Sequence, residues 1–385
     1  MKKLIYLKLV ILSLIFQGCS GDSDTIEIIV NTDQSNVSDD NSQSTTEFDR
    51  SSMLSFWADS IILPSIIGFE NELNIFNENV ANFTANPNAN NLALLREQWL
   101  MTYKKWQYVE MFDLGVAEEI FFKNRMNIFP ANVERIERNI KNQKFDLDES
   151  ANFAAQGFTA LDYLLFGVEQ EDDAILTKYS KTSLNYGDYL IQVTSKMQEL
   201  TVLVKAQWES NYRDSFVQST DNTATSSINM MLNDFVYYFE KGYRANKFGI
   251  PAGVFSGGPL PNRIEAYHGE MYSKILSLEA TTAIENFFNG VAYNDPATLG
   301  PSIKDYLDFV ESGSAERLSE SINEKLQGGR TKINELNTNF IKQIEDNNTS
   351  MLHTYDAIQS TVILFKVDML QKLNVSVDYA DADGD

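Results

Sequence analysis

The chain has 385 residues, enough for two domains of ordinary size. Its 54 acidic side chains outnumber its 31 basic ones, a balance that argues against nucleic acid or an anionic membrane surface as the main partner. Two histidines and one cysteine leave little material for a histidine-rich metal cage, a catalytic triad or a disulfide framework.

The first 20 residues are organised like a bacterial lipoprotein signal. Two lysines precede an apolar run over 4–16 that is too short to span a bilayer, and Gly18 and Cys19 follow it. This order resembles a lipobox, so we expect residues 1–18 to be a signal peptide and Cys19 to be lipidated. The alternative is an ordinary buried first helix. A lipid anchor would hold the mature protein in the bacterial cell envelope, at the outer membrane, facing the periplasm or the cell surface.

Residues 19–47 are mainly Ser, Asp, Asn, Thr and Gln. Such a segment cannot bury enough apolar surface to offset the entropy lost on ordering, so we expect a flexible, acidic and polar tether. The folded part is expected to start near residue 48.

Helical periodicity dominates the rest of the chain. Apolar residues spaced by three and four, as over 190–204 and 228–239, place one apolar stripe on each helix. Further helices are predicted over 51–81, 92–122, 132–141, 149–166, 263–288, 302–323, 331–345 and 351–373. Pro64 is expected to kink the first of these. The polar stretch 211–227 marks a boundary, so we predict an all-α fold with two helical bundles, 48–220 and 221–385.

One predicted helical segment, 157–167, has a small polar patch among apolar residues. Thr159 and Asp162 are three residues apart and so share a helix face, and Gly157 allows another backbone to approach closely. The local alternative is an amphipathic helix in which Thr159 bonds to the preceding turn.

The same segment resembles the signature of the imelysin family, Gly-x-His-x-x-Glu followed by an aromatic residue, two leucines, an aromatic residue and glycine. Thr159 stands where the family has histidine, and Asp162 where it has glutamate, so the motif is degenerate here. Other segments resemble the family in the same order: the tryptophan-bearing stretch 99–115 with Glu110, the stretch 247–265 that ends in Glu265, and the tail 373–385.

This resemblance implies an all-helical protein of two bundle-like domains, with the motif near their junction and facing a cleft. It also implies a location in the cell envelope. The family was first described through a metallopeptidase, and many members are tied to iron uptake. These are two different classes of function.

The altered motif weakens a transition-metal site. A threonine hydroxyl is a poor ligand for zinc or iron, whereas aspartate remains a hard oxygen donor. If a site is retained, we expect it to consist of Asp162 with Glu110 and Glu265 and to hold a hard cation through oxygen ligands. Glu265 and His268 are spaced i, i+3 on the predicted helix, so His268 is the fourth candidate metal ligand; a solvated pair is the simpler interpretation.

Three hypotheses for function follow. The first is a lipid-anchored, non-catalytic binding or accessory protein related to iron or haem uptake, with a metal cation as a candidate cofactor. The second is a metallopeptidase, which would need a metal-bound water and a general base. The third is an interaction module that binds a peptide, glycan or other envelope ligand. The iron connection rests on the family resemblance alone.

Overall fold

The computed structural model describes residues 47–377. The predicted signal peptide 1–18, Cys19, nearly all of the predicted tether 19–47 and the tail 378–385 lie outside the described residues. The regular secondary structure of the described residues is helical apart from one short hairpin, which confirms the predicted all-α class.

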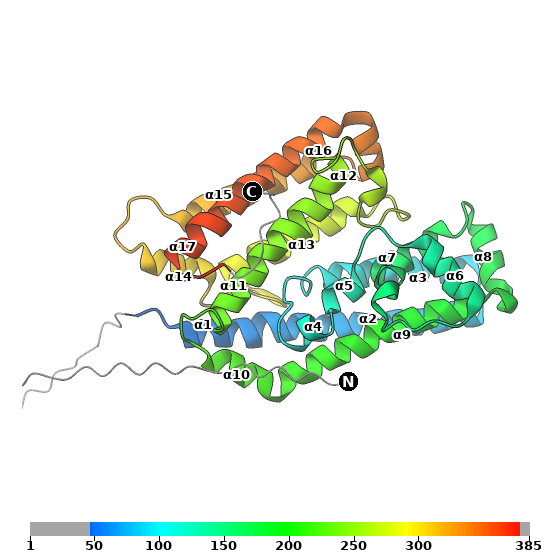
Figure 1. Ribbon diagram of the computed structural model, residues 1–385, viewed down its shortest axis with the longest axis horizontal. Helices are drawn as coiled ribbons and strands as arrows, with labels where there is room; N and C mark the ends of the chain where they lie inside the picture. Colours follow the sequence, from blue (N-terminus) through cyan, green and yellow to red (C-terminus); the bar gives the residue numbers. More distant parts are fainter. Residues whose placement is uncertain (1–46, 378–385) are drawn as a thin grey trace, which may run out of the picture. The chain divides into compact units, whose positions relative to one another are not determined.

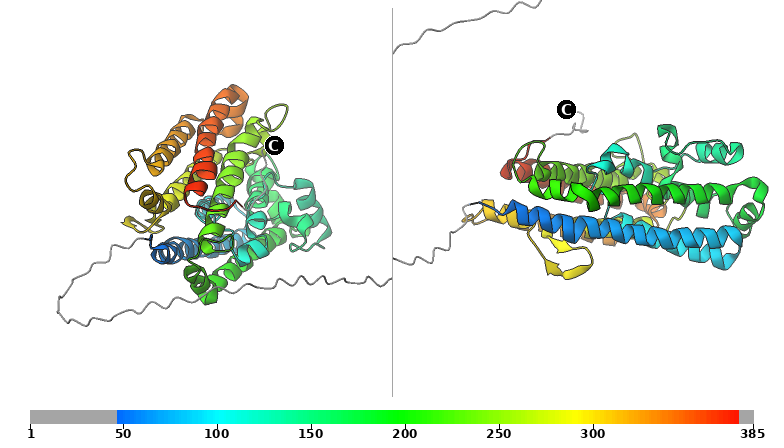
Figure 2. Two further views of the ribbon diagram at one scale, coloured as in Figure 1. Left: turned by 60° about the vertical axis from the view of Figure 1, so that its left-hand side comes forward. Right: turned by 90° about the horizontal axis from the view of Figure 1, so that it is seen from below.

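The first half of the described chain is built on three long helices, α2, α3 and α9. Buried side chains on α2 follow a three- and four-residue spacing (Phe69, Leu73, Phe76, Val80 and Phe83), and this stripe faces the core. Helix α2 packs against both α3 and α9, and α9 runs beside it in Figure 1 and in the right-hand view of Figure 2. The helices of this half are α1 (Arg50–Phe56), α2 (Leu63–Ala85), α3 (Ala89–Trp106), α4 (Val116–Glu119), α5 (Phe122–Met126), α6 (Val133–Asn142), α7 (Gly157–Asp162), α8 (Asp172–Ser180), α9 (Tyr186–Gln207) and α10 (Arg213–Gln218).

The second half is a group of helices that pack around α13, α15 and α16 (Figure 1). Helix α15 contacts both α13 and α16. The helices are α11 (Ser227–Tyr237), α12 (Ile250–Ala252), α13 (Ser273–Asn289), α14 (Ile303–Val310), α15 (Leu318–Glu335), α16 (Phe340–Ile363) and α17 (Leu370–Lys372). The hairpin pairs β1 (Val291–Ala292) antiparallel with β2 (Asp295–Leu299).

Short π-helical and 3₁₀ segments join several of these helices. The π segments are η1 (Trp57–Ile62), η3 (Tyr163–Gly167), η5 (Trp208–Tyr212), η6 (Tyr238–Gly249) and η8 (Leu364–Met369), and the 3₁₀ segments are η2 (Ser150–Ala155), η4 (Thr182–Leu184) and η7 (Pro261–Arg263). Pro64 is the second residue of α2, just after the helix changes from π to α geometry. The helix continues through it to Ala85.

One helix of the described chain is long and apolar enough to cross a membrane. It is the continuous helix Arg50–Ala85, and half of its most apolar window is buried inside the fold. The core helix of a globular protein has the same properties, so length and composition do not identify it as a membrane span.

Five of the predicted helices extend through segments that are not helical. The helix predicted over 92–122 ends at Trp106, and the one over 149–166 is divided into η2, α7 and η3. The helix predicted over 263–288 begins only at Ser273. The helix predicted over 302–323 is divided between α14 and α15, and the one over 331–345 spans the end of α15 and the start of α16. Helical periodicity in the sequence extends through these breaks, but tertiary hydrogen bonds and backbone turns interrupt the helices.

The helices on either side of residue 220 contact one another. Helix α3 from the first half packs on α13 from the second half. The predicted division into bundles at 220 and 221 stays a prediction.

Candidate functional site

The degenerate motif begins at a glycine that the backbone requires. Gly157 has a φ of +74°, a conformation that side chains with a Cβ rarely adopt. A Cβ built there would overlap the carbonyl oxygen of Met126, at the end of α5. The first motif residue therefore allows α7 to start close against the preceding backbone.

Thr159 is buried on α7, with 3% of its surface exposed. Its hydroxyl donates a hydrogen bond to the carbonyl oxygen of Ile128 at 2.6 Å. The residue thus ties α7 to the loop after α5, rather than to the preceding turn of its own helix.

Both carboxylate oxygens of Asp162 accept hydrogen bonds from the backbone. The N–H of His268 lies 2.8 Å from Oδ2, and the N–H of Gly269 lies 2.7 Å from Oδ1. Burial raises the pKa of Asp162 to about 7, although the two N–H groups act in the opposite direction. The carboxylate is a staple that holds α7 against the segment before α13.

This stapled segment, 264–272, is not helical, contrary to the predicted helix 263–288. Ala266 and Glu270 have positive φ values of 55° and 49°, which an α-helix does not allow. Glu265 and His268 therefore do not share a helix face, and the predicted i, i+3 pair is wrong in its geometry.

The imidazole of His268 is packed between aromatic rings. Its ring centroid lies 5.3 Å from that of Tyr163 and 5.0 Å from that of Tyr267. It also rests on Gly167, the last motif glycine, where a Cβ would overlap the ring. Burial lowers the pKa of His268 to about 4, so the imidazole is neutral at physiological pH.

Glu110 and Glu265, the other two predicted cleft carboxylates, meet in a buried hydrogen-bond network. Asn127 donates to Oε1 of Glu110 at 3.1 Å and to Oε1 of Glu265 at 3.0 Å. Lys247 Nζ lies 2.5 Å from Oε2 of Glu265 and 2.9 Å from Oε1 of Gln107. The Lys247 and Glu265 side chains are each 1% exposed, so this ion pair is isolated from solvent.

Glu110 is incompletely satisfied. Its Oε2 is buried and has no hydrogen-bond partner among the described residues. Burial raises the pKa of Glu110 to about 7; the charge of Lys247 opposes this rise, and that of Glu265 reinforces it. A proton on Glu110 would relieve the repulsion between the two carboxylates.

Tyr103 links this network to the motif. Its hydroxyl donates to Oδ1 of Asn127 at 2.5 Å. Burial raises the pKa of Tyr103 well above its usual range, and the charges of Glu265, Glu110 and Asp162 add to the rise. The charges of all three predicted carboxylates therefore act on one tyrosine.

This shared influence on one tyrosine does not make the three carboxylates a metal centre. Within residues 47–377, no three His, Cys, Asp or Glu side chains are grouped so that they could hold a metal ion. Asp162 uses both oxygens on backbone groups, and Glu265 is paired with Lys247. The candidate ligands Asp162, Glu110, Glu265 and His268 do not fit a transition-metal site in this arrangement.

Thr159, Asp162 and His268 instead line a cavity of about 210 Å³, the motif pocket. Its other lining residues are Phe129, Pro130, Ala131, Val133, Asn262, Ile264 and Tyr267. Thr159, Asp162 and Ile264 are buried, and Asn262 is exposed. The pocket is therefore polar next to the hydrogen bonds of Asp162, and the rest of its lining is mostly apolar.

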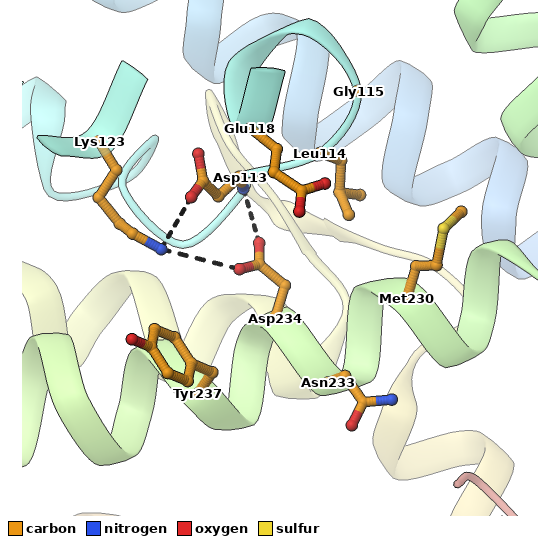
Figure 3. Close-up of a pocket in the computed structure, with 9 residues that line it drawn as sticks. All are labelled: Asp113, Leu114, Gly115, Glu118, Lys123, Met230, Asn233, Asp234 and Tyr237. Carbon is orange, nitrogen blue, oxygen red and sulfur yellow. Dashed lines mark hydrogen bonds and ion pairs between the residues drawn. The ribbon is translucent and has the colours of Figure 1, made fainter. Parts of the chain in front are cut away.

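A separate cavity of about 310 Å³ lies between α4, α5 and α11 (Figure 3). Lys123 Nζ is 2.9 Å from Asp113 and 4.0 Å from Asp234, and the N–H of Asp113 donates to Asp234 at 2.6 Å. Burial raises the pKa of Asp234 to about 7, with Lys123 opposing the rise and Asp113 adding to it. This cavity shares no lining residue with the motif pocket, and the sequence analysis did not predict it.

Comparisons with known proteins agree with the fold. The family model described as Imelysin matches residues 69–364. The chain is similar to an imelysin-like protein from Psychrobacter arcticum 273-4, with 14% identity and a TM-score of 0.66 over 86% of this chain and 97% of that chain. It is also similar to a protein from Parabacteroides distasonis ATCC 8503 described as an iron-regulated protein A precursor, with 16% identity and a TM-score of 0.69 over 84% of this chain and 95% of that chain. Identities this low establish a shared fold alone. No curated protein matches the chain.

Proposed function

Because this chain belongs to the imelysin family, whose model covers most of its length, we propose that it is a lipid-anchored, non-catalytic binding or accessory protein of the cell envelope. We further propose that it serves iron or haem acquisition. The structural similarity to a protein described as iron-regulated supports this second part by analogy.

The non-catalytic part of the proposal rests on Asp162, because both of its carboxylate oxygens already accept backbone hydrogen bonds. A metallopeptidase needs a metal ion that activates water and protein ligands that are free to hold it. Here the two motif side chains hold backbone segments together, Thr159 through Ile128 and Asp162 through the N–H groups of His268 and Gly269. Their arrangement supports a structural role at the place where the family motif supplies histidine and glutamate.

A zinc titration tests this proposal. We expect the parent protein and Asp162→Asn to bind Zn²⁺ with affinities within about twofold, because Asp162 is committed to the staple and is not a ligand. We expect the double variant Thr159→His with Asp162→Glu to bind Zn²⁺ at least about tenfold more tightly than the parent, since imidazole and carboxylate at i and i+3 are good zinc ligands. Isothermal titration calorimetry measures both.

Thr159→Val with Asp162→Asn is the matched control, because it changes the same positions without adding a ligand. Two results would contradict the proposal. One is a loss of zinc affinity in Asp162→Asn, and the other is proteolysis by the pure parent protein that a chelator stops and Asp162→Ala abolishes.

The proposed lipid anchor at Cys19 can be tested separately in cells. We expect Cys19→Ser to abolish incorporation of labelled fatty acid and to release the protein into the soluble fraction, because the thiol is the predicted site of acylation. Helical content, measured by circular dichroism, should not change. Ser20→Ala is the matched control and should remain labelled. Labelling that persists in Cys19→Ser would rule out lipidation at this residue.

A further inference from the structure

We propose that the motif pocket binds a small uncharged organic molecule with one ring and one hydroxyl group. This inference rests on the proposed function, in which the motif residues do not hold a metal ion. It assigns an organic ligand to the position where the family signature carries histidine and glutamate.

The size of the pocket sets the size of the ligand. An apolar cavity of about 150 Å³ in a protein interior can hold benzene. The motif pocket, at about 210 Å³, is large enough for a ring with a short substituent. Phe129, Pro130, Ile264 and Tyr267 supply apolar and aromatic surface for the ring.

The charges around the pocket favour a neutral ligand. Among the described residues that line it there is no lysine or arginine, so an anion would find no counter-charge. The single carboxylate, Asp162, already accepts two backbone hydrogen bonds, so a cation would have to compete with the staple. Burial keeps the imidazole of His268 neutral.

Two polar groups remain available to a hydroxyl. The hydroxyl hydrogen of Thr159 is used on Ile128, so its oxygen can only accept another hydrogen bond. In the described part of the chain, no hydrogen bond uses either ring nitrogen of His268. Nδ1 of His268 packs on Gly167, which leaves Nε2 for a ligand. With Nε2 as the protonated nitrogen, His268 would donate to the ligand hydroxyl and Thr159 would accept its hydrogen.

Three probes of similar size and different charge test the inference: benzyl alcohol, benzylammonium and benzoate. Ligand-observed NMR titrations with the protein should show benzyl alcohol binding at least about tenfold more tightly than either charged probe. The inference would be overturned if benzylammonium or benzoate bound most tightly of the three probes, or if benzyl alcohol did not bind.

Variants locate the binding. Ala131→Phe should fill the pocket and abolish benzyl alcohol binding, whereas Ala174→Phe, at a half-buried alanine of α8 outside the pocket, should not affect it. Thr159→Val should weaken the binding of benzyl alcohol and leave that of toluene unchanged, because it removes one of the two polar partners and keeps the shape. Binding that survives Ala131→Phe would overturn the inference.

The zinc titration on the same samples separates the two proposals. Zinc binding that depends on Asp162 would contradict the proposed function whatever the organic probes do. If the protein has no zinc site that depends on Asp162 and also does not bind benzyl alcohol, the pocket inference is overturned and the proposed function is not.

Discussion

Replacing Lys247 with methionine is expected to destabilise the protein by about 3–5 kcal/mol, because Glu265 would be left as an uncompensated buried charge. The two side chains are each 1% exposed and their charged atoms are 2.5 Å apart. Lys247 also donates to Gln107, so the change removes a second buried hydrogen bond. Urea-induced unfolding, followed by circular dichroism, measures the loss.

An exposed ion pair supplies the control. Lys332 and Glu335 are 2.8 Å apart, with 43% and 56% of their side chains exposed, so Lys332→Met should cost less than about 1 kcal/mol. The double variant Lys247→Met with Glu265→Gln should recover at least half of the loss, since it removes the unpaired charge. A cost for Lys247→Met no larger than that for Lys332→Met would show that the pair is not isolated from solvent.

Asp162→Ala is expected to cost about 2 kcal/mol near pH 6, because it leaves the N–H groups of His268 and Gly269 without their acceptor. The cost should also depend on pH. The pKa of Asp162 is raised to about 7 in the fold, so the folded state holds its proton more tightly than the unfolded state does. The stability that this proton contributes is complete below pH 4 and is lost as the pH rises through 7.

The parent protein should therefore lose more stability than Asp162→Ala when the pH is raised from 6 to 8. Glu110 and Asp234, whose pKa values are also raised to about 7, add the same trend to both proteins. His268 acts in the opposite sense, because its lowered pKa makes the fold less stable as the pH falls from 6.5 toward 4. Asp188→Ala, at an exposed aspartate, should follow the parent. Equal slopes for parent and Asp162→Ala would contradict the buried, stapled carboxylate.

Local signals in the sequence predict most helices of this fold. The start predicted at residue 132 is confirmed, because Asn132 caps α6 by accepting the N–H of Arg135. The apolar stripe predicted over 190–204 lies on α9, and its side chains are buried. Each of these features depends on residues that are neighbours along the chain.

The segment 264–272 shows where local signals fail. Its apolar spacing continues into α13, so the pattern predicts a helix. In the structure Ala266 and Glu270 have positive φ values, and the N–H groups of His268 and Gly269 bond to Asp162, more than 100 residues earlier. Helical periodicity carries no information about such a distant acceptor.

The candidate site was predicted only in part, because its residues also come from distant parts of the chain. Glu110 and Glu265 were singled out through a family resemblance and lie close together, bridged by Asn127. The pairing of Lys247 with Glu265 was not predicted, although Lys247 opens one of the stretches that carry the resemblance. Sequence spacing alone does not show which of 31 basic residues will be buried beside which carboxylate.

The buried network also constrains the order in which the chain can complete its interior during synthesis. Gln107, Glu110 and Asn127 leave the ribosome more than a hundred residues before their partners Lys247 and Glu265. Until those partners arrive, an N-terminal fragment that closed its core would bury polar groups without hydrogen bonds. The nascent first half is therefore expected to stay open until the second half has been synthesised.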